Sequence, residues 1–156
     1  MKDKTKDLII AGIAILALIG LIYFAMNLLK LPQDNPNQEP LFLVVNVTDG
    51  DTFTIATGEI VRLICVDTPE KDEENYTKAK DFLSSLILGE EVRLEQDENA
   101  SASEGYDKYN RLLRYAYLNT SEGELFINKE IVQKGYGMLF PYGNSTSRCE
   151  EIGEKE

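Results

Sequence analysis

The 156-residue sequence contains no histidine and only two cysteines. Histidine is the side chain that most readily exchanges protons near neutral pH, and it is a common ligand of transition metals. Its absence excludes catalytic sites built on imidazole and most transition-metal centres. Carboxylate and guanidinium groups remain as candidates for chemistry. Carboxylate oxygens suit hard cations such as Ca2+ or Mg2+, and guanidinium groups suit phosphate oxygens.

Basic residues are also scarce, with 16 Lys and Arg against 27 Asp and Glu, which gives a net charge of -11. The first 40 residues hold four basic and four acidic residues, so the whole excess falls on residues 41–156. A domain this acidic repels polyanions at long range. Any chemistry on nucleic acid therefore requires a local cationic site or a bound divalent metal.

The two cysteines leave room for one disulfide in an oxidising compartment. Cys65 lies inside an apolar segment, which is typical of a buried thiol, so we expect it to be unpaired. A bond between Cys65 and Cys149 is the lesser alternative, because the sequence does not place the two sulfur atoms together.

Residues 8–29 form an uncharged, mainly apolar run of 22 residues. Because about 20 apolar residues cross a bilayer as a helix, this run predicts a single transmembrane anchor. The basic residues Lys2, Lys4 and Lys6 predict that residues 1–7 form a cytoplasmic tail. We therefore expect a single-pass protein of the cell membrane with its main domain outside the cytoplasm. Removal of the run as a signal peptide, with secretion of the domain, is the minor alternative.

The rest of the chain divides into three parts. Residues 30–40 are rich in proline and polar residues and predict an extended tether. Residues 41–143 carry the periodic apolar patterns of a folded domain. Residues 144–156 are polar and predict a C-terminal tail.

Alternating and β-branched segments predict five strands, with a helix after the third and a second helix after the fifth. The strands are expected at 41–48, 52–56, 59–66, 90–96 and 111–119, and the helices at 76–88 and 125–137. In the second helix, Phe126, Ile131 and Val132 are expected to face inward. This order predicts an α+β fold, a five-stranded OB-type β-barrel with two helices.

Two acidic clusters stand at strand ends, Asp49-Gly50-Asp51-Thr52 and Asp67-Thr68-Pro69-Glu70. If the first strand pairs with the third, Asp51 and Asp67 approach one another, and their like charges require a cation. Arg62 and Arg111 lie on strands near these clusters. Each feature alone has a structural interpretation, as a hairpin turn, a helix N-cap or a solvated arginine. Together they indicate a site.

The segments DGDT (49–52), VRLICVDTPE (61–70) and DKYNR (107–111) resemble the signature of the thermonuclease family, the calcium-dependent staphylococcal-nuclease-like phosphodiesterases. The resemblance covers about residues 43–142. It implies an OB-type barrel that hydrolyses DNA and RNA, single-stranded or denatured, and leaves 3'-phosphate ends. A monomer is expected.

The resemblance also implies roles for individual residues. Asp51, Asp67 and the backbone carbonyl of Thr68 would bind Ca2+, with Asp49 beside the ion. Glu70 would position or deprotonate the attacking water. The two arginines, Arg62 and Arg111, would bind the scissile phosphate and stabilise the charge of the transition state.

Substrate contacts are implied for Lys108, Tyr109 and Tyr142. The sequence departs from the family pattern in two places. Asn110 replaces a glycine, although asparagine tolerates a left-handed backbone. The family adds a third amphipathic helix after the barrel, whereas the residues after Tyr142 are polar.

The sequence thus predicts a Ca2+-dependent nuclease that acts outside the cytoplasm. Two other classes remain open. A degenerate OB-fold module would bind nucleic acid or protein without catalysis, and a calcium-binding surface module would bind metal without hydrolysis. Retention of both arginines and all three carboxylates favours the nuclease.

Overall fold

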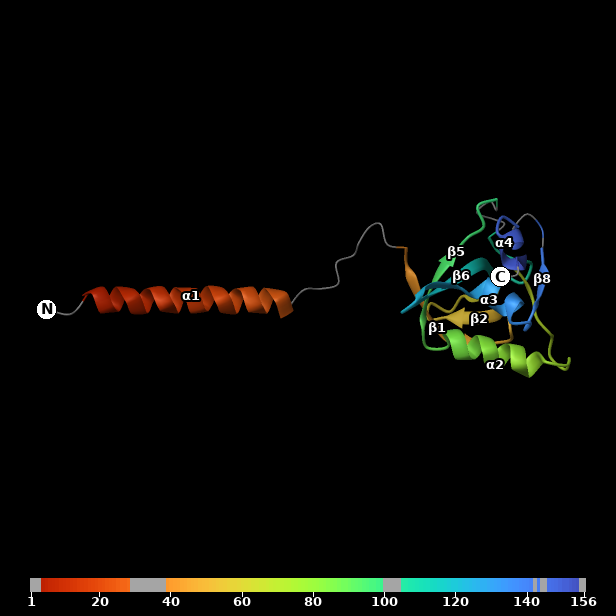
Figure 1. Cartoon of the computed structure of the whole chain (residues 1–156), viewed down its shortest axis with the longest axis horizontal. Coiled ribbons are helices and arrows are strands. Elements are labelled where there is room, and N and C mark those ends of the chain that lie inside the picture. Colours follow the sequence, from red (N-terminus) through yellow and green to blue (C-terminus); the bar gives the residue numbers. More distant parts are fainter. Residues whose placement is uncertain (1–3, 29–38, 100–104, 142, 144–145, 155–156) are drawn as a thin grey trace. The chain divides into compact units, whose positions relative to one another are not determined.

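The computed structural model describes residues 4–28, 39–99, 105–141, 143 and 146–154 (Figure 1). The chain divides into two compact units, Met1–Gln38 and Glu39–Glu156. The division falls close to the predicted start of the folded domain.

In the first unit, helix α1 (Lys4–Leu28) takes up most of the predicted span at 8–29. Within the part of the chain that the structure describes, no helix has both the length and the apolar character needed to cross a membrane. Most of the predicted tether at 30–40 lies outside the described residues.

The second unit is built on a six-stranded sheet in the order β3-β2-β1-β5-β6-β7, counted over the described residues. Its strands are β1 (Leu41–Val47), β2 (Thr52–Ile55), β3 (Ile60–Leu63), β5 (Glu91–Glu95), β6 (Leu112–Thr120) and β7 (Gly123–Phe126). Strand β3 also pairs with β6 in parallel, and this closes five of the strands into a barrel. The predicted OB-type α+β fold is confirmed.

The first and third strands do not pair with each other, although the approach of Asp51 to Asp67 was predicted on that condition. Strand β1 pairs with β2 on one side and with β5 on the other, both antiparallel. Strand β2 therefore separates β1 from β3, and β3 uses its other edge to bind β6. The hairpin connection explains the order, because consecutive antiparallel strands joined by a short turn pair first with one another.

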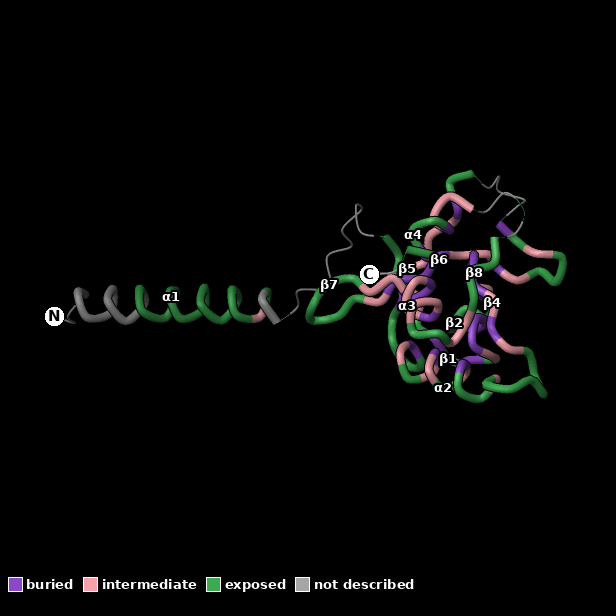
Figure 2. Tube along the Cα trace, turned by 45° about the vertical axis from the view of Figure 1, so that its right-hand side comes forward, coloured by how far each residue is buried: buried purple, intermediate pink, exposed green. Residues whose placement is uncertain are grey.

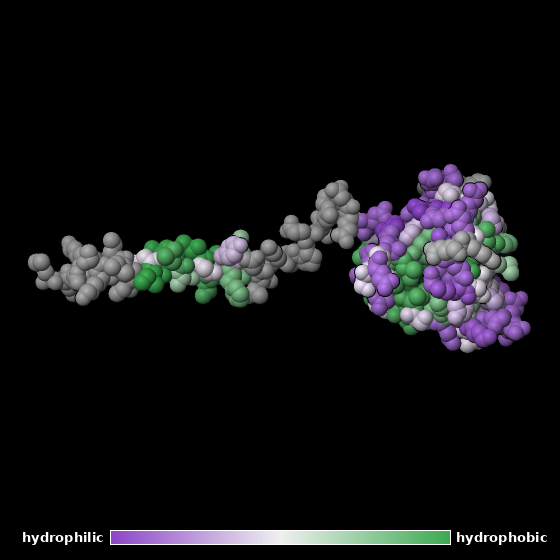
Figure 3. Space-filling view, viewed as in Figure 1, coloured by the Kyte–Doolittle hydropathy of each residue, from purple (hydrophilic) through white to green (hydrophobic). Residues whose placement is uncertain are grey.

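The barrel interior is filled by the inward-facing members of the alternating strands (Figure 2). Phe53, Val61 and Val92 are fully buried. On the outside, Leu41, Leu43 and Val45 of β1 remain exposed. Figure 3 shows an apolar area among hydrophilic residues on one face of this unit. Burial along β3 follows the period of two that predicted the strand, whereas β1, β2 and β6 depart from strict alternation.

Two helices pack on this core where the sequence predicts them. Helix α2 (Tyr76–Ile87) buries Ala79, Leu83 and Ile87, which recur every fourth residue and so share one face. Helix α3 (Ile127–Gln133) buries Ile127 and Ile131, while Phe126 and Val132 are half-buried at its edge. The inward position predicted for Ile131 is confirmed, and the other two are only partly enclosed.

The strand predicted at 59–66 is divided. Cys65 has a backbone φ of 61°, in the left-handed region, and there the chain leaves β3 and enters β4 (Cys65–Asp67). Strand β4 pairs with β8 (Met138–Phe140) in a separate two-stranded sheet. Asp67, at the end of β4, remains within hydrogen-bond distance of Arg62 on β3.

The predicted polar tail at 144–156 contains a short helix, α4 (Cys149–Gly153), whose Ile152 is fully buried. Cys149 forms a disulfide with Cys65, with their Cα atoms 5.5 Å apart. The expectation of an unpaired thiol at Cys65 is therefore wrong. Among the described residues of this segment, Cys149 and Ile152 are the two that are buried, too few for a helical period to be visible in the sequence.

A buried carboxylate fastens this C-terminal segment to the barrel. Asp97 accepts hydrogen bonds from the Tyr115 hydroxyl (2.6 Å), from the backbone N–H of Ser147 and its hydroxyl (both 2.9 Å), and from the N–H of Asn99 (2.8 Å). Burial by itself raises the pKa of Asp97, but these hydrogen bonds outweigh burial and hold the pKa below its ordinary value.

We expect Asp97→Asn to lower the free energy of unfolding at pH 7 by about 2 kcal/mol, because hydrogen bonds to a charged acceptor are lost. The folded-state pKa is lowered, so this contribution is complete above the ordinary aspartate pKa and disappears as the pH falls through the lowered value. Urea unfolding of the wild type and of Asp97→Asn, from pH 7 to pH 3, measures this contribution. The difference in free energy of unfolding between the wild type and Asp97→Asn should decrease below about pH 4. A difference that stays constant with pH would contradict the role given to the charged Asp97.

Candidate active site

Arg62 joins the two acidic clusters. It lies on β3 opposite Thr52 of β2, directly beside Asp51. Its Nη1 forms an ion pair with Asp51 Oδ1, and its Nη2 donates to Asp67 Oδ1 at 3.1 Å. The structure therefore brings Asp51 and Asp67 to the same guanidinium, as the sequence predicts, although the pairing of β2 with β3 achieves this instead of a pairing between β1 and β3.

Asp51 is 4% exposed and has a complete set of partners. Its Oδ2 accepts from the N–H and the hydroxyl of Thr68, at 2.9 and 2.8 Å, and its Oδ1 accepts from the Thr52 hydroxyl at 3.0 Å. Burial raises the pKa of Asp51 to about 6, against the opposing charge of Arg62 and with a further increase from Asp49. A carboxylate buried this deeply needs a nearby positive charge.

Gly50 makes this packing possible. A β-carbon at this position would lie 2.7 Å from Ala79 Cβ and 2.8 Å from the Thr68 hydroxyl oxygen. The Asp-Gly-Asp turn therefore needs glycine for close approach to α2 and to the loop after β4.

The donor set around Asp51 fits a hard cation. Asp51 and Asp67 converge, and Asp49 lies close enough to raise the pKa of Asp51. No group of three or more acidic, cysteine or histidine side chains suited to a metal ion occurs among the described residues. Asp51 and Asp67 would supply two carboxylates to a hard cation such as Ca2+, which takes six to eight oxygen ligands with flexible geometry.

Arg111 is held by Asp107 at the start of β6. Its Nε donates to Asp107 Oδ2 at 2.6 Å, while the N–H groups of Arg111 and Tyr109 both donate to Asp107 Oδ1 at 2.9 Å. Asn110 adopts a φ of 62°, so it does tolerate the left-handed backbone that its position requires. Asp107 was not singled out in the sequence, although it is the first residue of the DKYNR segment.

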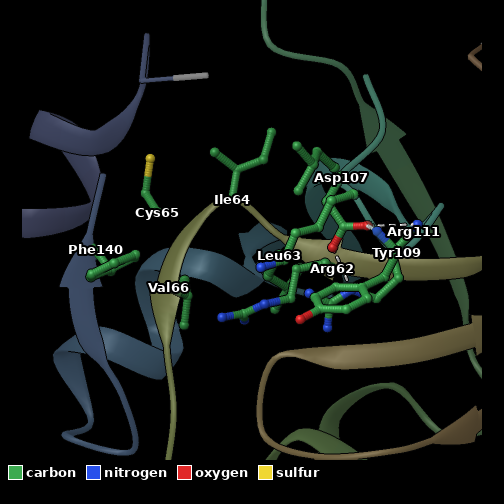
Figure 4. A pocket seen from close by; sticks show the side chains of 11 residues that line it. Arg62, Leu63, Ile64, Cys65, Val66, Asp107, Tyr109, Arg111 and Phe140 are labelled. Carbon is green, nitrogen blue, oxygen red and sulfur yellow. Dashed lines mark hydrogen bonds and ion pairs between the residues drawn. The ribbon is translucent and has the colours of Figure 1, made fainter. Parts of the chain in front are cut away.

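A cavity of about 200 Å³ connects the two arginines (Figure 4). Arg62, Arg111, Lys108 and Tyr109 line it, and the Lys108 ammonium lies 4.9 Å from the centre of the Tyr109 ring. Figure 4 shows Arg62, Tyr109 and Arg111 gathered at one side and Phe140 at the other. Three cationic side chains line this small cavity together with Asp107, within an otherwise acidic domain, and guanidinium groups suit phosphate oxygens.

The other predicted site residues are less closely engaged. Thr68 is buried and binds Asp51 through its side chain, whereas the role implied for it uses its carbonyl. Glu70 is exposed, and its backbone N–H donates to Glu73 Oε2 at 2.8 Å. Its side chain does not line the cavity between the arginines. Tyr142 lies outside the described residues.

Comparison with known proteins finds a family and two relatives that this chain resembles. The family described as "Staphylococcal nuclease homologue" matches residues 60–156. A protein of Haemophilus influenzae named "Uncharacterized endonuclease" is 36% identical over 101 residues, which cover 62% of this chain and 51% of that protein. An uncharacterised protein of Methanocaldococcus jannaschii is 30% identical over 122 residues, which cover 62% of this chain and 58% of that protein.

The chain spans somewhat more than half the length of these two curated relatives. The matched range in the family includes Arg62, Asp67 and Arg111, and it extends through α4 to the C-terminus. With the match covering more than half of the chain, this protein belongs to the staphylococcal nuclease homologue family.

Proposed function

We propose that this protein is a Ca2+-dependent nuclease that hydrolyses phosphodiester bonds of single-stranded or denatured DNA and RNA. The observation that carries the proposal is the meeting of Arg62 and Arg111 in one cavity, with the carboxylates of Asp51 and Asp67 bound to the first of them. A phosphodiester with an adjacent cation satisfies all of these groups together.

Asp51, Asp67 and the Thr68 carbonyl would hold the ion. Bound Ca2+ supplies positive charge that polarises a phosphoryl oxygen. Arg62 and Arg111 bind the remaining phosphoryl oxygens and stabilise the charge that develops on them in the transition state. Their guanidinium groups are preorganised, because Asp67 and Asp107 fix them through hydrogen bonds of 3.1 and 2.6 Å.

Glu70 accepts a proton from the attacking water. The new bond forms between the water oxygen and phosphorus, the bond from phosphorus to the 5'-oxygen breaks, and that oxygen leaves with a proton from solvent. The products are a 3'-phosphate and a 5'-hydroxyl. The exposed loop position of Glu70 gives it access to water.

We further propose that the domain acts outside the cytoplasm. The disulfide between Cys65 and Cys149 supports this location, because such bonds persist in oxidising compartments and are rare in the cytosol. The bond would be intact in protein isolated under thiol-blocking conditions.

The test follows cleavage of heat-denatured DNA and of single-stranded RNA by the full chain in millimolar Ca2+. Cleavage should stop in chelator, return with added Ca2+, and fall in Glu70→Gln. Glu74→Gln, in the same exposed loop, is the matched control and should retain activity. A folded protein that binds Ca2+ and nucleic acid without cleaving it would instead establish a binding module.

A further inference from the structure

A second cavity, of about 400 Å³, lies at the other end of the small sheet formed by β4 and β8. In that sheet Cys65 pairs with Phe140 and Asp67 pairs with Met138. The first pair lines the cavity that holds the arginines, and the second pair lines the second cavity. The two cavities are therefore neighbours along the sheet, and Asp67, bound to Arg62, stands between them.

The second cavity combines apolar and polar groups. Tyr136 stacks on Phe82 with ring centres 4.1 Å apart, and Met138 is 64% exposed at the rim. Lys78 extends from α2, and its ammonium donates to the side chain of Asn75 at 2.9 Å. An ammonium has three donors, so this bond leaves capacity for a ligand.

The charges of the second cavity restrict its ligand. Asp67 and Glu73 both line it, so a phosphate placed beside them would be repelled. A nucleobase is uncharged, stacks on apolar and aromatic surface, and donates hydrogen bonds from ring or amino N–H groups to carboxylates. Lys78 is the cationic group of this cavity, and it suits a phosphate at the rim.

We infer that the second cavity binds the nucleotide next to the scissile phosphate, with its base against Met138 and Tyr136 and the next phosphate at Lys78. This inference rests on the proposed function, since it extends the substrate from the arginine cavity across β4 and β8. A base enters such a cavity only after it leaves a duplex stack, so the substrate is single-stranded. Apolar contact carries little sequence information, so every base is accepted.

The test measures KM and kcat of the full chain for a dinucleotide and for an octanucleotide of one sequence. The dinucleotide has no phosphate beyond the scissile one, so Lys78→Ala should raise KM only for the octanucleotide, about threefold, with kcat unchanged. In Lys78→Ala, the slope of the logarithm of octanucleotide affinity against the logarithm of salt concentration should decrease by about 1. Met138→Ser should raise KM for both substrates, because it removes contact with the base.

Lys80→Ala is the matched control, since Lys80 lies on the same helix and does not line the cavity. The thermal unfolding midpoints of the variants check that they fold. Lys78 and Met138 are exposed, so their replacement leaves the core intact. If the wild type cleaves both substrates and Lys78→Ala behaves like Lys80→Ala, the second cavity is not a nucleotide site. Absence of cleavage by the wild type would reject the proposed function itself.

Discussion

Replacing Arg111 by lysine should lower kcat for cleavage of denatured DNA by about 10²- to 10³-fold, the usual cost of losing one preorganised donor to transition-state charge. Lysine keeps the positive charge, but it lacks the planar fork that binds two phosphoryl oxygens at once. Asp107 holds the guanidinium by its Nε at 2.6 Å, and this leaves the two terminal nitrogens directed elsewhere. The measurement is single-turnover cleavage in saturating Ca2+.

Arg93→Lys provides the control for this substitution. The Arg93 guanidinium lies 4.0 Å from the centre of the Tyr117 ring and pairs with Glu124, and it lines neither cavity. This variant should cleave at the wild-type rate. Retention of more than a tenth of the activity in Arg111→Lys would show that Arg111 contributes charge alone, and the proposed role for its fork would be wrong.

Loss of the disulfide is expected to have the largest effect on stability. Cys65 and Cys149 are separated by 84 positions, and closing a loop of this length stabilises a fold by about 4 kcal/mol in the chain-entropy treatment. Cys149→Ala should lower the free energy of unfolding by that amount, because α4 then loses its covalent link to the barrel and is held by buried Ile152 and by the hydrogen bonds of Ser147 and Arg148. Urea unfolding without reductant measures the difference.

The same experiment with reductant separates the bond from the side chain. Reductant should bring the wild type to nearly the stability of Cys149→Ala and leave the variant unchanged. An equal midpoint for the wild type with and without reductant would contradict the expected contribution. Loss of the disulfide should also affect the candidate active site, because Cys65 lines the arginine cavity and precedes Asp67 by two residues.

The regular strands were predictable because their segments either alternate between apolar and polar residues or are rich in apolar and β-branched residues. Strands β1, β2, β5 and β6 lie where this pattern places them. Strands β4 and β8 have three residues each, too few to show a period of two. The left-handed backbone of Cys65, which divides the predicted third strand, follows no local preference of cysteine.

The candidate site was predictable from short motifs, and its architecture was not. The motifs identify Asp51, Arg62, Asp67 and Arg111, which the structure gathers at neighbouring positions. The sequence does not show which strand edge joins them, because strand pairing depends on packing across the whole domain. The same limit applies to the disulfide, because Cys65 and Cys149 meet where α4 packs beside Ile64 and Tyr115, far from it in the sequence.

The pairing of β3 with β6 determines when the candidate active site can form during synthesis. Arg62 pairs there with Leu113, two residues after Arg111, so the two arginines meet only when the last strand of the barrel docks in parallel on an early one. Parallel pairing of distant segments is a late and slow event in folding. A chain still emerging from the ribosome has therefore made Arg62, Asp67 and Glu70 before the cavity between the two arginines exists, and this cavity is assembled only after synthesis has passed β6.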